Sequence, residues 1–116
     1  MNIAEKFGTI PDHWNPRMID ELNDFAVKAV KLKGEFIWHH HDIEEELFLV
    51  AKGTLRMRFR DCEATVRGGE LSIVPHGTEH QPMADEEMHL FLLEPNAPLN
   101  TGNITNERTV RQLERI

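Results

Sequence analysis

The sequence contains no tyrosine, only one cysteine and no long apolar run. The single cysteine, Cys62, cannot form an intramolecular disulfide, and it lacks the CxxC spacing of a zinc or redox motif. No stretch approaches the roughly 20 apolar residues that a membrane-spanning helix needs, so we predict no membrane association. The amino terminus has no basic region followed by an apolar core, and we therefore expect a cytoplasmic protein.

Basic residues are also in the minority. The 13 lysines and arginines against 20 acidic residues give a formal charge of −7 and a sequence pI near 5.4. Nucleic-acid binding usually requires a clustered basic face, whereas the basic residues here are scattered. Arg56, Arg58 and Arg60 alternate along one segment, which is typical of a solvated sheet face. We predict no nucleic-acid partner.

A chain of 116 residues, 40% of them hydrophobic, fits a single domain, which we assign to residues 1–116. Ile3, Phe7 and Ile10 recur at helical spacing and predict a short helix before Pro11. The rest of the chain has short extended segments between glycines and prolines, the pattern of an all-β sandwich or barrel. The predicted strands span residues 17–21, 25–32, 35–41, 47–51, 54–60, 63–66, 71–74, 79–83 and 88–94.

The predicted strand over residues 35–41 suggests an interface. Side chains alternate along a strand, so Phe36 and Trp38 face outward if His39 and His41 face the barrel interior. The next strand is apolar on both of its faces. Outward aromatics beside such a strand indicate a covered exterior, covered either by the first strands of the chain or by a second subunit. We predict a homodimer.

Three histidines and a glutamate carry the chemistry. His39 and His41 share one face of an extended strand, and Glu46 on the following strand can complete a cluster with His80. Three imidazoles and a carboxylate make a site for one divalent transition metal, such as Zn, Fe, Mn or Ni. Four protein ligands leave room for water or a substrate. The alternatives are a metal-free barrel with hydrogen-bonded core histidines, or a closed site that only stabilises the fold.

These residues resemble the two sequence motifs of the cupin superfamily. The first motif, with a glycine, HxH, a glutamate and a second glycine, is matched by Gly34, His39, His41, Glu46 and Gly53. The second, a glycine, PxG and a histidine, is matched by Gly69, Pro75, Gly77 and His80. The resemblance implies an RmlC-like jelly-roll barrel with one metal held by His39, His41, Glu46 and His80. More narrowly, the chain resembles small single-domain bacterial cupins with a WHHH motif and an LNTG segment at 99–102.

The chain departs from the motifs at two positions. Four residues separate Gly34 from His39 where the first motif has five, so a shifted register would use His40 and Asp42 with Glu46. That register replaces a histidine with an aspartate and leaves two histidines unused, and we therefore favour His39 and His41. Ala84 stands where the second motif usually ends in an asparagine that is not a ligand.

We expect the metal to bind a small oxygen-bearing metabolite, through two cis oxygens or one carboxylate, with isomerase, lyase or dioxygenase chemistry. The absence of tyrosine counts against the proton-transfer chemistry of sugar-epimerase-like cupins. His89 and Glu45 are the candidate catalytic groups for proton transfer: His89 could line the cavity, and Glu45 lies in the loop before Glu46. A satisfied core histidine and a solvated carboxylate are the alternatives for these two residues.

A non-catalytic module that binds or senses a metabolite or a metal is the alternative function. The segment after Pro95 carries Val110 and Leu113 at helical spacing and could pack as an arm across a neighbour or trail.

Overall fold

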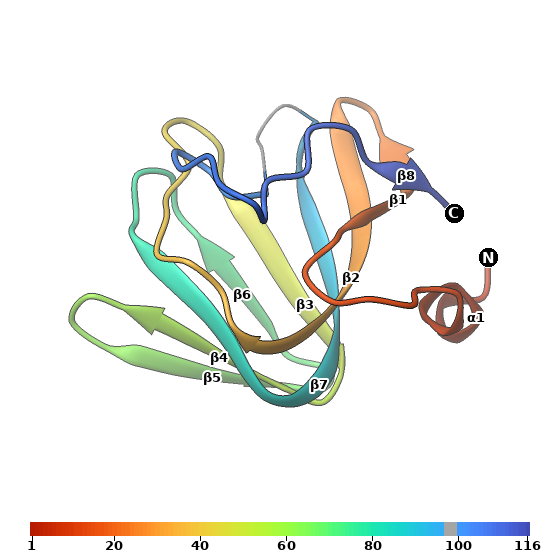
Figure 1. The fold of residues 1–116 in the computed structure, drawn as a ribbon, viewed down its shortest axis with the longest axis horizontal. Coiled ribbons are helices and arrows are strands. Elements are labelled where there is room, and N and C mark those ends of the chain that lie inside the picture. The colour runs from red at the N-terminus through yellow and green to blue at the C-terminus, as the bar shows by residue number, and fades with distance from the viewer. Residues whose placement is uncertain (97–99) are drawn as a thin grey trace.

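The computed structural model describes residues 1–96 and 100–116, so Leu99 of the LNTG segment lies outside the described residues. The described residues form one short helix and the eight strands of a single sheet (Figure 1). The elements are α1 (Ile3–Gly8), β1 (Arg17–Leu22), β2 (Phe25–Glu35), β3 (Glu46–Lys52), β4 (Thr54–Phe59), β5 (Glu63–Arg67), β6 (Leu71–Val74), β7 (His80–Pro95) and β8 (Glu114–Arg115). This confirms the predicted all-β jelly roll with a short amino-terminal helix.

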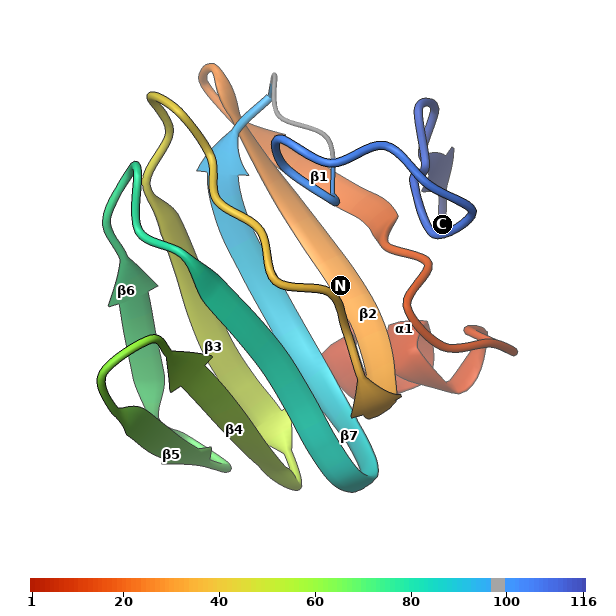
Figure 2. The same ribbon diagram turned by 60° about the vertical axis from the view of Figure 1, so that its left-hand side comes forward.

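Strand β7 bends and belongs to both layers of the barrel (Figures 1 and 2). Its first residues, from His80 to Met83, pair antiparallel with β4. The pairing with β2 includes Met83 and Ala84 and resumes at Met88, and the pairing with β3 begins at His89. The prediction of two strands, 79–83 and 88–94, was therefore wrong. The acidic residues between them, Asp85, Glu86 and Glu87, are exposed at the bend of one continuous strand.

The predicted strand over residues 35–41 was also wrong. Strand β2 continues through Glu35, and residues 36–45 then run beside the first half of β7, with one isolated bridge between His39 and His80. The Pro82 carbonyl oxygen accepts a hydrogen bond from the Phe36 N–H at 3.0 Å. Pro82 has no N–H group, so it cannot donate one to the 36–45 segment in return. The side-chain amide of Gln81 donates to the Phe36 carbonyl instead, at 2.9 Å. Because the ladder is broken here, regular alternation does not fix the side-chain directions.

Two apolar clusters hold the fold together. The first fills the barrel and consists of Val30, Leu32, Phe48, Val50, Leu55, Met57, Val66, Val74, Ala84, Met88, Leu90 and Leu92. The second joins α1 to the outside of the barrel and contains Phe7, Ile10, Ile19 and Ala29. Asn2 caps α1 by accepting a hydrogen bond from the Glu5 N–H at 3.0 Å. Helix α1 therefore covers part of the outer face of β2, and the barrel interior is left to the first cluster.

The carboxyl-terminal segment packs on its own barrel. Residues 100–116 contain no helix, and β8 pairs in parallel with β1. The N–H of His40 donates to Asn103 Oδ1 at 2.9 Å, and the N–H of Asn103 donates to the His40 carbonyl at 3.0 Å. The segment thus lies beside the loop that carries the histidines (Figure 2). Within the part of the chain that the structure describes, no helix is long and apolar enough to cross a membrane.

Candidate metal centre

The four predicted ligands converge inside the barrel. His39 and His41 come from the 36–45 segment, Glu46 begins β3 and His80 begins β7. Their side chains are buried, with exposed fractions of 2%, 5%, 5% and 0% respectively. One ligand atom from each of the three histidines lies within 4.8 Å of the others. Glu46 Oε1 is 3.5 Å from His41 Nε2 and 3.8 Å from His80 Nε2.

Backbone carbonyls orient two of the imidazoles. Nδ1 of His39 lies 3.0 Å from the carbonyl oxygen of Ile37, and Nδ1 of His80 lies 2.8 Å from that of Thr78. A carbonyl oxygen only accepts, so Nδ1 carries the proton in both rings and Nε2 keeps its lone pair. Metal-binding histidines usually donate their other ring N–H to a neighbouring group in this way, which fixes the orientation of the ring.

Burial keeps the imidazoles neutral. Loss of solvent lowers the pKa of His39 to about 3 and that of His80 to about 4, and it also lowers the pKa of His41. Burial raises the pKa of Glu46, and the nearby Glu94 and Lys28 partly offset this rise. Neutral imidazoles are the form that binds a cation. The three rings are therefore ready to donate at neutral pH.

The donor set fits a divalent transition metal. Four buried atoms have no hydrogen-bond partner among the described residues: His41 Nε2, Glu46 Oε1, His80 Nε2 and Glu94 Oε2. An unsatisfied buried polar group costs about 1 to 3 kcal/mol, so four in one place need an explanation. Nitrogen and carboxylate donors grouped in this way suit a cation such as zinc, iron, manganese or nickel.

The shifted register of ligands does not form a cluster with His80. His40 is only partly buried, and its ring nitrogens lie 2.8 Å from Asp42 Oδ1 and 3.1 Å from Glu79 Oε2. Asp42 is exposed. Hydrogen bonds to Glu79 and Asp42 raise the pKa of His40, in contrast to the buried histidines. The structure therefore groups His39 and His41, and not His40 and Asp42, with His80.

The two predicted proton-transfer residues lie away from this cluster. His89 stacks on Phe7 of α1, with ring centroids 4.7 Å apart, whereas Leu90 and Leu92 line the interior. The expectation that His89 lines the cavity was wrong, because alternation along β7 turns it outward. Glu45 is exposed in the 36–45 segment, in agreement with the solvated alternative.

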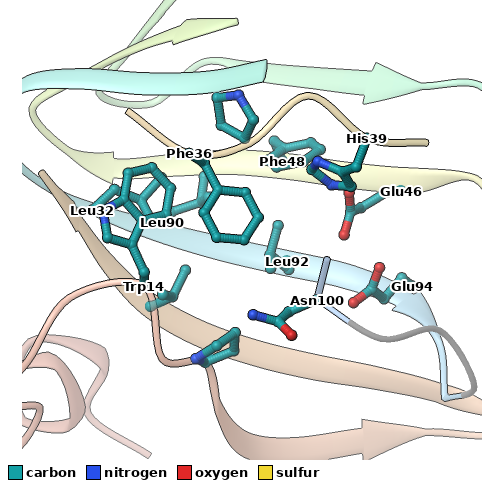
Figure 3. Close-up of a pocket in the computed structure, with 13 residues that line it drawn as sticks. Trp14, Leu32, Phe36, His39, Glu46, Phe48, Leu90, Leu92, Glu94 and Asn100 are labelled. Atoms are coloured by element: carbon teal, nitrogen blue, oxygen red, sulfur yellow. The ribbon is translucent and has the colours of Figure 1, made fainter. Parts of the chain in front are cut away.

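A mostly apolar pocket opens beside the metal-binding residues (Figure 3). It encloses about 440 Å³ of empty space, part of it open to solvent. Its lining residues are Trp14, Pro16, Val30, Leu32, Phe36, His39, Glu46, Phe48, Pro82, Leu90, Leu92, Glu94 and Asn100. The rings of Trp14 and Phe36 stack at 4.8 Å, and Phe36 meets His39 edge-on at 5.4 Å. The pocket therefore offers aromatic surface next to the candidate metal ligands.

The outward direction predicted for Phe36 was wrong. Phe36 is buried and lines the pocket, because the 36–45 segment is not a regular strand. Trp38 remains partly exposed, with the Arg60 guanidinium 3.9 Å from its ring centroid.

Sequence reasoning missed Glu94, Lys28 and Asn100. Glu94 lines the pocket, and its Oε1 accepts a hydrogen bond from the buried Lys28 Nζ at 2.6 Å. The signal was present, because Glu94 follows Leu90 and Leu92 at the two-residue spacing of one strand face. Asn100 lies in the LNTG segment and binds two backbone groups of the same tail, at Arg108 and Val110.

The protein is a jelly-roll barrel whose interior holds three buried histidines. Residues 28–94 match the family model described as the cupin domain, which is more than half of the chain. This chain belongs to the cupin domain family.

Two crystal structures support this assignment. A cupin-2 domain containing protein from Shewanella frigidimarina NCIMB 400 is 45% identical, with a TM-score of 0.82, over 83% of this chain and 94% of that chain. Protein NMB1881 from Neisseria meningitidis is 28% identical, with a TM-score of 0.77, over 83% of this chain and 98% of that chain.

The uncharacterized protein YdbB of Bacillus subtilis (strain 168) is 39% identical over 64 residues. The match covers 54% of this chain and 57% of YdbB, so it spans little more than half of that relative's length.

Proposed function

We propose that this cupin binds one divalent transition metal through His39, His41, Glu46 and His80, and that the metal binds a small oxygen-bearing metabolite. The observation that carries the proposal is the inward direction of unpartnered donor atoms, of which His80 Nε2 is fully buried. The Nδ1 bonds of His39 and His80 to backbone carbonyls support it, because they leave Nε2 free to donate.

We further propose that the protein is an isomerase, a lyase or a dioxygenase. A divalent ion bound here would polarise a carbonyl or enolate oxygen, or, as iron, support reaction with dioxygen. The chain's own residues would position the ligand: Trp14 and Phe36 offer a flat surface, and the apolar side chains of the pocket limit access of water. The indole N–H of Trp14 donates to the Lys33 carbonyl at 2.8 Å, which fixes that ring.

A non-catalytic binding or sensing module is the second candidate function. It is favoured by the scarcity of acid and base groups at the pocket, because His89 and Glu45 lie elsewhere. Among the described lining residues, only Glu94 is a titratable group outside the four proposed ligands. The choice between enzyme and binding module therefore depends largely on what Glu94 does.

The metal content of the purified protein tests the proposal. Untagged protein, prepared without added metal or chelator, should contain about one iron, manganese, nickel or zinc per chain by plasma mass spectrometry. His80→Ala should lose most of this metal, whereas the control His13→Ala, which changes a more exposed histidine, should keep it. Wild-type protein that carries no metal and takes up none on reconstitution would refute the proposal.

A ligand panel separates the two candidate functions. Metal-replete protein would be incubated with diols, keto acids and catechols, and both product formation and thermal shifts would be recorded. Turnover that is lost in His80→Ala supports an enzyme. Metal-dependent thermal shifts without turnover support a binding module.

A further inference from the structure

A buried ion pair lies next to the proposed metal ligands. Lys28 on β2 and Glu94 on β7 are 4% and 2% exposed, and Lys28 Nζ lies 2.6 Å from Glu94 Oε1. A buried ion pair is weak support for stability, because apolar residues of similar size often serve as well. The pair therefore invites a functional explanation.

The carboxylate of Glu94 lies beside the donor cluster. Glu94 Oε2 is buried and has no hydrogen-bond partner among the residues that the structure describes. Ligand atoms of His41, Glu46 and Glu94 all lie within 4.8 Å of one another. Figure 3 shows the carboxylates of Glu46 and Glu94 facing each other across the pocket. His41 is thus shared by the histidine cluster and by the group that contains Glu46 and Glu94.

Charge explains why two carboxylates could be kept so close together. With both ionised, Glu46 and Glu94 carry two negative charges, and Lys28 offsets only one of them. The three imidazoles are neutral, so none of them supplies a positive charge to the two carboxylates. A divalent cation would balance this arrangement, because like charges in a dry site otherwise repel strongly.

We propose that Glu94 is a fifth protein ligand of the metal, with its other oxygen held by Lys28. This inference rests on the proposed function. Five protein ligands leave one position open on a six-coordinate ion, so the metabolite binds through a single oxygen and not through two cis oxygens. Glu94 is then committed to the metal, and Lys28 acts as a positioning residue for it.

Titration of the metal-free protein with cobalt(II) tests this inference in solution. Glu94→Gln should weaken cobalt binding at least about 100-fold, more than the loss of a group outside the coordination sphere typically costs. The matched control Glu87→Gln changes an acidic residue of the same strand that pairs with His13 outside the barrel, and it should bind within about twofold of wild type. Binding of Glu94→Gln within about threefold of wild type would overturn the inference.

A crystal structure of the cobalt-loaded wild type decides the matter even if the variant fails to fold. We expect a Glu94 oxygen at about 2.0 to 2.2 Å from the metal, the range of carboxylate ligands. A metal held by His39, His41, Glu46 and His80, with both Glu94 oxygens beyond about 3 Å, would overturn the inference and leave the proposed function standing. Failure of wild type to bind any metal would overturn both.

Discussion

His80 and Thr78, two residues apart, are joined by a hydrogen bond from the imidazole Nδ1–H to the Thr78 carbonyl oxygen at 2.8 Å. The turn that begins at Pro75 therefore sets the direction of the His80 lone pair. The same turn holds the other histidine-bearing segment, because the N–H of Gly77 donates to the His41 carbonyl at 2.7 Å. One short turn thus places two of the candidate ligands relative to each other.

The buried histidines predict a loss of stability in acid for the metal-free protein. Burial depresses the pKa of His80 to about 4 and that of His39 to about 3. Below about pH 6.5 the histidines bind protons in the unfolded chain but stay neutral in the folded protein. The free energy of unfolding therefore decreases as the pH falls from about 6.5 toward 4. Replacing His80 with Gln should reduce the slope of unfolding free energy against pH by up to about 1.4 kcal/mol per pH unit.

Urea unfolding at several pH values between 4 and 6.5, with chelator present, measures this slope. The raised pKa of Glu46 acts in the opposite direction, because the folded state then holds a proton above pH 4.5 that the unfolded chain releases. The comparison of wild type with His80→Gln isolates the histidine contribution. Parallel pH profiles for the two proteins would contradict the prediction.

Replacing one residue of the buried ion pair should destabilise the protein more than replacing both. Lys28→Met leaves Glu94 buried without its cation and should lower the free energy of unfolding by about 3 to 5 kcal/mol. The double variant Lys28→Met with Glu94→Leu should recover most of this loss, because no buried charge of the pair remains. Denaturant unfolding of the metal-free proteins checks both values, and a double variant less stable than Lys28→Met would refute the argument.

Gly102 fixes the carboxyl-terminal segment to the histidine loop. A Cβ at Gly102 would lie 2.2 Å from the His40 carbonyl oxygen, and the residue has a φ of +60°. Gly102→Ala should therefore destabilise the protein by about 2 to 3 kcal/mol and expose the tail to protease. Gly8→Ala is the control, since a Cβ there meets no atom within 4 Å. Equal melting temperatures and equal proteolysis of the two variants would argue against this contact.

We propose that the chain forms a homodimer through the outer face of β3 and β6. Leu71 and Ile73 are 56% and 55% exposed, and they pair in register with Leu49 and Leu47. This face lies beyond the reach of the second apolar cluster, which α1 makes with β2. Leu71→Glu with Ile73→Glu should convert a dimer into a monomer by light scattering, and Leu22→Glu on the exposed β1–β2 hairpin should leave it unchanged. A monomeric wild type would contradict the proposal.

The sequence predicted most strands because β1 to β6 follow simple rules. Alternating side chains in β4 placed that strand correctly. In the turn between β1 and β2, Asn23 adopts a positive φ of 54°, which asparagine tolerates. The bend of β7 was missed because the polar residues Asp85, Glu86 and Glu87 separate two segments that each look like a strand, although β7 continues through them.

The spacing of the motifs predicted the four candidate ligands, but it did not predict the residues around them. His39 and His41 were expected to point inward because they are two residues apart, and they do so although no regular strand is present. Phe36 was placed on the wrong side by the same rule. Lys28 and Glu94 are 66 positions apart in the sequence and come into contact only because β2 pairs with β7. Such long-range pairs depend on register, which composition does not reveal.

The missing N–H of Pro82 has a consequence for how this barrel tolerates length changes. The 36–45 segment is bound to β7 at few points. No continuous ladder of hydrogen bonds therefore fixes the number of residues between Gly34 and His39. An insertion or deletion there can be absorbed by the segment while the two histidines keep their places. One residue added within β7 between Leu90 and Glu94 would instead turn Glu94 out of the barrel, since every later side chain would change face. The two halves of the candidate site therefore differ in the insertions and deletions that they can accept.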